Sequence, residues 1–307
     1  MKKIIIILCL TIMLSTFSFA GHVNSNSATK FPVVLVHGWS GFDNKLGIDY
    51  FYGIVNALKD KGVDVYVAEV SPVNSSEFRG EQLYLQVENI LNLTGAKKVN
   101  LIGHSHGSMT SRYVASNWPR KVASVISVGG VNWGAKAFDL ALNAFDSNNS
   151  SAFIFRQLNK ITSLFYGTSS ENIDTRAAYY SLSTKGSLAF NKKYPQGVPK
   201  QWCGKNGKRK VKGVRYYSWT GYSAVTNGWD LSDIPLYYID KDIYKPAGQQ
   251  SDGLVPVCGS YLGEVLKSYN MNHLDETNQV FGIVSPYETS PVDVYLDNID
   301  MLKKAGL

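Results

Sequence analysis

A serine between two glycines is the residue of this chain best suited to covalent chemistry. Gly103-His104-Ser105-His106-Gly107 follows a short apolar run, residues 98–102, and precedes residues 108–118, where apolar side chains recur at helical spacing. A serine on a sharp strand-to-helix turn presents its hydroxyl outward, and such a turn needs small flanking residues because a Cβ would clash across it. The pattern therefore predicts that Ser105 is a nucleophile rather than part of a plain glycine-rich turn.

A serine hydroxyl is a weak nucleophile, so Ser105 needs an imidazole base that a carboxylate orients. Four of the five histidines fit this role poorly, because they lie near the amino terminus, after the first predicted strand or directly beside the serine: His22, His37, His104 and His106. His37 is better placed to shape an oxyanion loop. When the nucleophile sits on such a turn, the chain order is serine, acid, histidine, which leaves His273 as the base.

Chain order alone does not identify the acid, since several aspartates and glutamates lie between the serine and His273. Asp252 stands out because Gln250-Ser251-Asp252-Gly253-Leu254-Val255-Pro256 is a tight turn into an apolar run, where a carboxylate can be held rigidly at the end of a strand. Asp230 is the nearest rival. On this reasoning both aspartates stay open.

Alternating strands and helices must position these residues. Apolar or β-branched runs predict strands at 31–36, 63–70, 98–102 and 122–128, with helices at 49–61, 81–93 and 108–118. This alternation indicates an α/β protein with a mostly parallel central sheet and helices on both faces. Together with the serine turn it predicts the α/β-hydrolase fold. Neither an internal repeat nor a long linker interrupts the pattern, which favours a single domain over residues 21–307.

Two short amphipathic helices are predicted between residues 135 and 166. Their apolar stripes are Phe138, Ala141, Leu142 and Phe145, then Ile154, Leu158, Ile161 and Phe165, with a polar stretch at 146–151 between them. Such an insertion after a core strand suits a lid that covers an apolar site and opens. The same stripes also suit ordinary core packing, so both interpretations stay open.

Residues 1–20 have the pattern of a secretory signal peptide. Two lysines after Met1 precede an apolar run, residues 4–14, and Ser18-Phe19-Ala20 forms a small-residue cleavage site. The apolar run is shorter than the roughly 20 residues that a membrane-spanning helix needs. We therefore expect a secreted protein without a transmembrane segment, cleaved after Ala20.

Charge and cysteine content narrow the class further. The formal charge of +7 falls by two when Lys2 and Lys3 leave with the signal, which does not indicate nucleic-acid binding. A basic run at residues 205–212 predicts a solvated hairpin turn rather than a docking site. The mature chain keeps Cys203 and Cys258, and an even pair in an oxidising compartment predicts one disulfide, with two buried free thiols as the alternative.

Several separate stretches, in order, resemble the Gram-negative true lipases of bacterial lipase family I, the Pseudomonas and Proteus type. The resemblance runs from Phe31 to the carboxyl terminus and rests on residues 34–38, 79–83, 99–107, 251–255 and 272–279. It implies a secreted triacylglycerol lipase whose triad is Ser105, Asp252 and His273. It also implies an oxyanion hole made by the backbone N–H groups of Trp39 and His106.

The same resemblance implies one structural Ca²⁺ beside the catalytic histidine. The matching positions all offer oxygen ligands: Asp230, Asp275, Gln279 and the backbone carbonyl of Ile283. An ion that joins the segment carrying His273 to Asp230 would pin the histidine loop without entering the chemistry. Cys203 and Cys258 match the disulfide of the family. Its members differ in their need for a lipase-specific foldase, so that partner stays open.

One stretch departs from the family pattern. Where many members have Gly-Ala-Pro-His-x-Gly-Ser, this chain has Gly129-Gly130-Val131-Asn132-Trp133-Gly134-Ala135-Lys136. The triad is untouched, but the wall of the acyl pocket differs, so the acyl-chain preference of the family is not carried over.

The sequence thus predicts a serine hydrolase that cleaves carboxylic esters of acylglycerols at a lipid–water interface. A carboxylesterase or acyltransferase acting on short, soluble esters is the alternative with the same triad. A calcium-stabilised surface-binding protein with a vestigial site is the alternative from another class, and intact positions at all three triad residues count against it.

Overall fold

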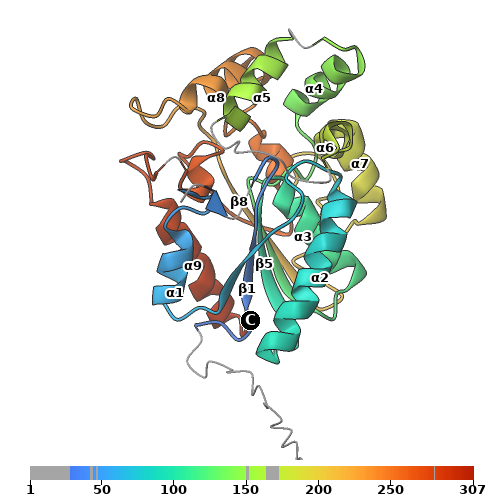
Figure 1. Cartoon of the computed structure of the whole chain (residues 1–307), viewed down its shortest axis with the longest axis vertical. Helices are drawn as coiled ribbons and strands as arrows, with labels where there is room; N and C mark the ends of the chain where they lie inside the picture. Colours follow the sequence, from blue (N-terminus) through green and yellow to red (C-terminus); the bar gives the residue numbers. More distant parts are fainter. Residues whose placement is uncertain (1–27, 42–43, 46–47, 150–151, 164–172, 280) are drawn as a thin grey trace, which may run out of the picture.

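A mostly parallel sheet forms the centre of the molecule (Figure 1). The computed structural model describes residues 28–41, 44–45, 48–149, 152–163, 173–279 and 281–307. The parallel strands lie in the order β4 (Val65–Ala68), β1 (Val33–Val36), β5 (Val99–His104), β6 (Val122–Val128), β8 (Val214–Gly221) and β9 (Glu264–Tyr269). The short strand β7 (Lys210–Val211) pairs with β8 in the antiparallel sense, and β2 (Asn44–Lys45) and β3 (Ile48–Asp49) form a separate pair.

The strand register brings the carboxyl ends of the central strands to one edge. Val36 at the end of β1 pairs with Gly103 of β5, and Gly103 pairs with Ser127 of β6. All residues of these three strands are buried, because helices cover both faces of the sheet. In such sheets, functional loops gather at this carboxyl edge.

Four helices supply the two covering layers (Figure 1). One face carries α1 (Ile54–Asp60) and α9 (Pro291–Lys304), and the other carries α2 (Ser76–Thr94) and α3 (His106–Asn117). Each layer buries its own apolar cluster against the strands, with Ile54, Leu58 and Ile299 in the first and Leu83, Val87 and Val114 in the second.

A helical cap lies over the carboxyl edge (Figure 1). We use this name for α4 (Lys136–Asp146), α5 (Phe153–Ser163) and α8 (Asp233–Ile239), beside which lie α6 (Thr175–Leu182) and α7 (Thr184–Lys193). Most of the described residues of the two apolar stripes belong to the same buried cluster as Leu254, Val255 and Leu274, namely Phe138, Ala141, Ile154, Leu158 and Ile161, whereas Phe145 of α4 is exposed. The cap therefore packs directly on the loops that carry Asp252 and His273.

Short irregular helices complete the chain between β8 and α9. They are a π-helical turn, Asp240–Tyr244, and 3₁₀ turns at Lys245–Ala247, Val257–Ser260 and Asp275–Thr277. No helix among the described residues is long and apolar enough to span a bilayer.

The predicted fold class is confirmed, with corrections at element boundaries. The helix predicted at 49–61 begins only at Ile54, because Gly53 adopts a left-handed conformation (φ 70°) and Asp49 belongs to β3. The helix predicted at 81–93 begins earlier, at Ser76, because the Ser75 hydroxyl caps it by accepting from Phe78 N.

The basic run forms the expected exposed hairpin, with Lys212 and Gly213 at the turn between β7 and β8. The predicted signal peptide, together with Phe165 and Tyr166 of the predicted lid, lies outside the described residues. The division into a signal peptide and one domain stays a prediction.

Candidate active site

Ser105 lies at a strained turn between β5 and α3. Its backbone has φ 55° and ψ −122°, a conformation that few side chains tolerate. A Cβ on Gly103 would lie 2.3 Å from the Gly107 carbonyl oxygen, which confirms the predicted clash across the turn. A Cβ on Gly107 would instead lie 2.1 Å from the carbonyl oxygen of Val36. The second glycine is thus needed because β1 ends beside the elbow, a cause that the sequence did not reveal.

The loop after β1 leaves one backbone donor without an acceptor among the described residues. The Gly38 carbonyl accepts from His37 Nδ1 at 2.9 Å and from Arg79 Nη1 at 3.2 Å. In a trans peptide the following N–H points opposite to the carbonyl. The Trp39 N–H is therefore turned away from Arg79, and the described residues offer it no acceptor.

Arg79 is the anchor of this loop. Its guanidinium is fully buried and also donates to the carbonyls of His37 (2.6 Å), Ser71 (2.8 Å) and Pro72 (3.2 Å) and to Thr110 Oγ1 (3.1 Å). Burial lowers the pKa of Arg79 to about 9, so the side chain stays charged at neutral pH. Burial and the nearby Arg79 charge lower the pKa of His37 to about 3, which keeps that ring neutral.

The second predicted oxyanion donor lies at the start of α3. His106 is the first residue of that helix, so its backbone N–H has no acceptor one turn earlier. Its side chain points elsewhere, since Nε2 lies 2.9 Å from Ser76 Oγ. This agrees with the expectation that His106 is not the base.

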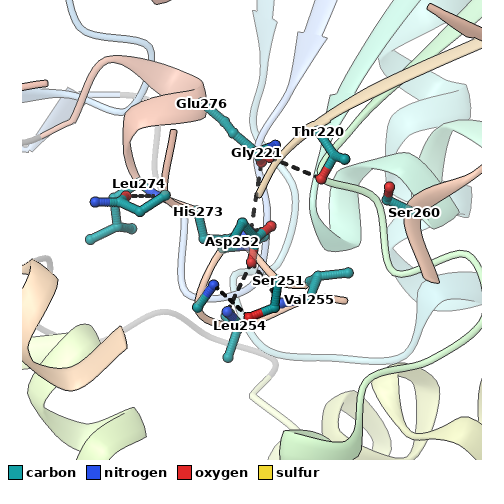
Figure 2. Close-up of polar contacts among 12 residues, drawn as sticks. Thr220, Gly221, Ser251, Asp252, Leu254, Val255, Ser260, His273, Leu274 and Glu276 are labelled. Atoms are coloured by element: carbon teal, nitrogen blue, oxygen red, sulfur yellow. Dashed lines mark hydrogen bonds and ion pairs between the residues drawn. The ribbon is translucent and has the colours of Figure 1, made fainter. Parts of the chain in front are cut away.

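His273 and Asp252 form a buried pair (Figure 2). His273 Nδ1 lies 2.8 Å from Asp252 Oδ2, while Asp252 Oδ1 accepts from the backbone N–H groups of Leu254 (2.8 Å) and Val255 (2.7 Å). The backbone N–H of His273 donates to the Asp252 carbonyl at 2.8 Å. The carboxylate is thus held on one oxygen by its own turn and holds the imidazole with the other.

The position of Asp252 differs from the expected strand end. It lies in the long excursion between β8 and β9, in a turn closed by a bridge between Ser251 and Pro256. Backbone donors inside the turn provide the rigidity that we expected from a strand. Among the described residues, no hydrogen bond joins Ser105 Oγ to His273, and catalytic hydrogen bonds of this kind often tighten only with substrate bound.

A second carboxylate, Glu276, is buried beside this pair. Its Oε2 lies 3.1 Å from His104 Nε2 and 3.7 Å from His273 Nδ1. Its Oε1 accepts from Thr220 Oγ1 (3.2 Å) and Gly221 N (2.5 Å) (Figure 2). Burial, with the Asp252 charge adding to it, raises the pKa of Glu276 well above its usual value. Burial lowers the pKa of His104, so its ring is neutral.

Two groups of side chains could hold a metal. His104, His273 and Glu276 bring three potential ligand atoms within 4.8 Å of one another, but these atoms already bond to one another or to Asp252. Two imidazoles with one carboxylate also differ from the all-oxygen set that calcium prefers. This cluster therefore belongs to the hydrogen bonding around His273.

The predicted calcium residues fit a cation better. Asp230 Oδ2 and Asp275 Oδ1 are both buried without a hydrogen-bond partner among the described residues. Burial raises the pKa of Asp275 to about 7, and the charges of Asp233 and Asp230 add to this effect. Buried, unpaired acidic oxygens are costly unless a cation compensates them.

The other two predicted ligands lie on neighbouring segments. Gln279 uses its amide nitrogen on the Tyr50 carbonyl, which leaves Oε1 for another partner. Ile283 precedes Val284, whose carbonyl accepts from Asn227 Nδ2 at 2.9 Å, and the Asn227 carbonyl in turn accepts from Asp230 N at 2.9 Å. The carboxyl-terminal loop is thus tied to the loop of Asp230.

Cys203 and Cys258 form the predicted disulfide, across 55 residues of sequence. Cys258 lies in the 3₁₀ turn that follows the Asp252 turn, and Cys203 lies near Trp202. The alternative of two free thiols is therefore wrong.

The stretch that departs from the family pattern forms a buried polar cluster. Asn132 donates to Ser127 Oγ (2.9 Å) and to the Ser260 carbonyl (2.8 Å), and it accepts from Arg112 Nη1 (3.1 Å). These bonds join β6, α3 and the 3₁₀ turn of Cys258 beneath the cap.

Comparison with known proteins agrees with this geometry. A family model described as alpha/beta hydrolase fold matches residues 32–200. Along its whole length the chain is 46% identical, over 317 residues, to a triacylglycerol lipase of Vibrio cholerae serotype O1, and the match covers 100% of both chains. The chain belongs to the triacylglycerol lipases of the α/β-hydrolase fold. Triacylglycerol lipases of Pseudomonas fragi (37% identical, 91% of this chain and 98% of the relative) and Burkholderia plantarii (34%, 92% and 88%) also match.

Solved structures support the fold of the lipase at lower identity. The mature lipase BlEst2 of Bacillus licheniformis matches with a TM-score of 0.61 and 19% identity, covering 90% of this chain and 95% of the other. A lipase of Staphylococcus hyicus matches with a TM-score of 0.62 and 17% identity, covering 92% and 98%.

Three residues around the site of the lipase were not assigned a role from sequence: Tyr50, Arg79 and Glu276. Two of them lie in stretches that carried the family resemblance, residues 79–83 and 272–279, which was the available signal. Tyr50 had no such signal, because the two partners of its hydroxyl, Gly38 and His104, lie 12 residues before it and 54 residues after it.

Proposed function

We propose that the lipase hydrolyses triacylglycerol through Ser105, His273 and Asp252. The observation that carries the proposal is the hydrogen bond of 2.8 Å between His273 Nδ1 and Asp252 Oδ2. The strained strand-to-helix turn at Ser105 supports it. His273 takes the Ser105 proton as Oγ bonds to the ester carbonyl carbon, and Asp252 stabilises the resulting imidazolium. The N–H groups of Trp39 and His106 bind the oxyanion.

The acyl-enzyme then forms and is hydrolysed by water. The tetrahedral intermediate collapses, the alkoxide leaves with the proton from His273, and the acyl group stays on Ser105. His273 next deprotonates a water, which attacks the acyl carbon, and the fatty acid leaves as Ser105 regains its proton. Atoms and protons balance over the two steps without any redox partner.

Substitution of the nucleophile tests this assignment. Ser105→Ala should lower kcat at least about 10⁴-fold on any ester, because removal of a triad nucleophile leaves only residual catalysis. It should also abolish labelling by a serine-reactive phosphonate. Ser116→Ala, on the same helix but bonded to Gln196, is the matched control and should keep near-wild-type activity. Near-wild-type hydrolysis by Ser105→Ala would refute the triad.

We further propose one structural Ca²⁺ held by Asp230, Asp275, Gln279 and the Ile283 carbonyl. The unpartnered oxygens of the two aspartates support it. When bound, the ion would supply positive charge that compensates these carboxylates. Asp275 lies two residues after His273, so the bound loop would keep the imidazole oriented toward Asp252.

Thermal unfolding tests the ion apart from catalysis. Calcium at 100 times its dissociation constant should stabilise the folded chain by about 2.7 kcal/mol and raise Tm. Asp230→Asn should remove most of that shift, whereas Asp242→Asn, an exposed aspartate, should keep it. An unchanged Tm of the wild-type lipase with calcium, chelator or neither would overturn the site.

We propose that the substrate is emulsified acylglycerol and that the cap acts as a lid over it. The apolar stripes of α4 and α5 against the triad loops support this. Hydrolysis of a long-chain emulsion should exceed that of a soluble short-chain ester. Activity confined to the soluble ester would favour the carboxylesterase alternative and make these helices packing elements.

We propose that the lipase is secreted after cleavage at Ala20. The disulfide supports an oxidising destination. Amino-terminal sequencing of the extracellular protein should begin at Gly21, and a chain that starts at Met1 would contradict cleavage. Refolding of the purified chain alone, followed by assay, would show whether a foldase is needed as partner.

A further inference from the structure

A chain of hydrogen bonds connects three catalytic segments that are far apart in sequence. The Gly38 N–H donates to Tyr50 Oη at 3.0 Å, and Tyr50 Oη lies 2.6 Å from His104 Nδ1. His104 Nε2 lies 3.1 Å from Glu276 Oε2. Gly38 precedes the oxyanion donor Trp39, His104 precedes Ser105, and Glu276 follows His273 by three residues.

The backbone donor determines the first bond of this chain. A backbone N–H can only donate, so Tyr50 Oη accepts from Gly38, and a Tyr50 hydroxyl that donates to His104 Nδ1 leaves the proton of that ring on Nε2. In that arrangement neutral His104 donates from Nε2 to Glu276 Oε2. Every member is buried, so water does not replace these partners.

Tyr50 holds the face of the oxyanion loop that Arg79 does not reach. Arg79 binds the carbonyl oxygens of His37 and Gly38, whereas the Tyr50 hydroxyl binds the N–H of the peptide between them. A Cβ on Gly38 would lie 2.7 Å from Tyr50 Oη and 2.8 Å from Ser105 Cβ. Gly38 thus lies between the Tyr50 hydroxyl and Ser105, with no room for a side chain.

We infer that Tyr50 and His104 are positioning residues that keep the oxyanion donor, the nucleophile and the histidine loop in register during acyl transfer. The inference rests on the proposed roles of Ser105, Trp39 and His273. Without the Tyr50 hydroxyl, the His37–Gly38 peptide loses its only described partner on that face, and the next N–H can move from the position where the oxyanion forms. Misplacement of about 1 Å can cost on the order of 100-fold in rate.

Tyr50→Phe is the first test, assayed on a soluble short-chain ester. We expect kcat per active site to fall about 10-fold to 100-fold while KM stays within about twofold, because the oxyanion exists only in the transition state. Active sites are counted by complete phosphonate labelling of Ser105, so unfolded protein does not enter the ratio. Tyr295→Phe is the matched control, since the Tyr295 hydroxyl is also buried but has no described hydrogen-bond partner.

His104→Gln is the second variant, because a glutamine amide nitrogen placed like Nε2 can still donate to Glu276, while the side chain has no acceptor atom at the position of the imidazole Nδ1. Combined with Tyr50→Phe, it should add less than about threefold to the loss of the worse single variant, since both remove the same link. The Tyr295→Phe and His104→Gln pair should have the activity of His104→Gln alone.

The outcomes separate this inference from the triad itself. If kcat per labelled site in Tyr50→Phe stays within about twofold of wild type, or if KM rises in proportion to the lost kcat/KM, the positioning role is wrong. Multiplicative losses in the Tyr50→Phe and His104→Gln pair would equally overturn the link. Failure of the triad would appear separately, as retained activity in Ser105→Ala.

Discussion

The loops that carry the proposed triad and the helical cap above them are held by different kinds of interaction. At the carboxyl edge of the sheet, buried polar side chains bind specific backbone groups, as Arg79 does for four carbonyls and Asp252 does for two N–H groups. In the cap, Phe138, Leu158 and Ile161 enter an apolar cluster. Hydrogen bonds are directional and apolar contacts are not.

This difference matches what the proposed role of each region requires. A donor that stabilises an oxyanion must lie within a few tenths of an ångström of its place, which directional bonds can ensure. A cover that admits a long acyl chain must move as a body, and apolar contacts can be exchanged for contacts with substrate at modest cost. The two regions should therefore respond differently to substitution.

Arg79→Met should give the largest effect. It removes one hydrogen bond from each of four carbonyls, two of which keep another described donor, so the free energy of unfolding should fall by about 3 kcal/mol or more. Release of the Gly38–Trp39 peptide should also lower kcat per active site about 100-fold. Denaturant unfolding and titrated kinetics measure the two quantities. Arg112→Met, equally buried but bonded to Asn132 and Asn191, should lose stability without a matching loss of kcat.

Leu158→Ala should separate stability from chemistry in the cap. Loss of this fully buried side chain should lower the free energy of unfolding by about 3 kcal/mol, as for other buried leucines. The kcat per active site on a soluble ester should stay within about threefold, because the polar loops beneath are intact. Leu140→Ala, at a partly exposed position of α4, should cost under about 1 kcal/mol. A tenfold loss of kcat in Leu158→Ala would show that the cap also positions catalytic atoms.

The pH dependence of stability should report the buried histidines. The folded pKa of His37 is lowered to about 3, so below pH 6.5 the unfolded chain binds a proton that the folded chain does not. The free energy of unfolding should then fall as pH drops from about 6.5 toward 4, by up to about 1.4 kcal/mol per pH unit from His37 alone. His37→Asn keeps an amide donor for the Gly38 carbonyl and should reduce this slope by that amount. An unchanged slope would mean that His37 titrates normally.

The local sequence pattern was enough to predict a strand that is buried on both faces. The strand predicted at 122–128 is β6 without correction, because a strand of a parallel sheet that is covered on both faces has apolar residues on both sides. The beginning of α1 could not be predicted in this way. The left-handed conformation of Gly53 and the pairing of Asp49 in β3 depend on how the preceding loop folds back.

For the candidate site, residue chemistry and chain order were enough to propose the nucleophile and the base. Motif and elimination indicated Ser105 and His273, and the resemblance chose Asp252 over Asp230. The supporting residues were out of reach, because Tyr50, His104 and Glu276 are joined only by contacts across up to 172 residues. Residue type and spacing carry no trace of such a contact, since each of these side chains would also suit a solvated surface.

The sequence separation of 172 between His104 and Glu276 also has a consequence for synthesis, because the two residues are made at different times. Strand β5, which precedes the serine, and its neighbours β1, β4 and β6 are complete by residue 128. Glu276, the partner of His104 Nε2, emerges from the ribosome only near the end of translation. Asp252 and His273 arrive equally late. A nascent chain therefore lacks the complete proposed triad until almost all of it has been made.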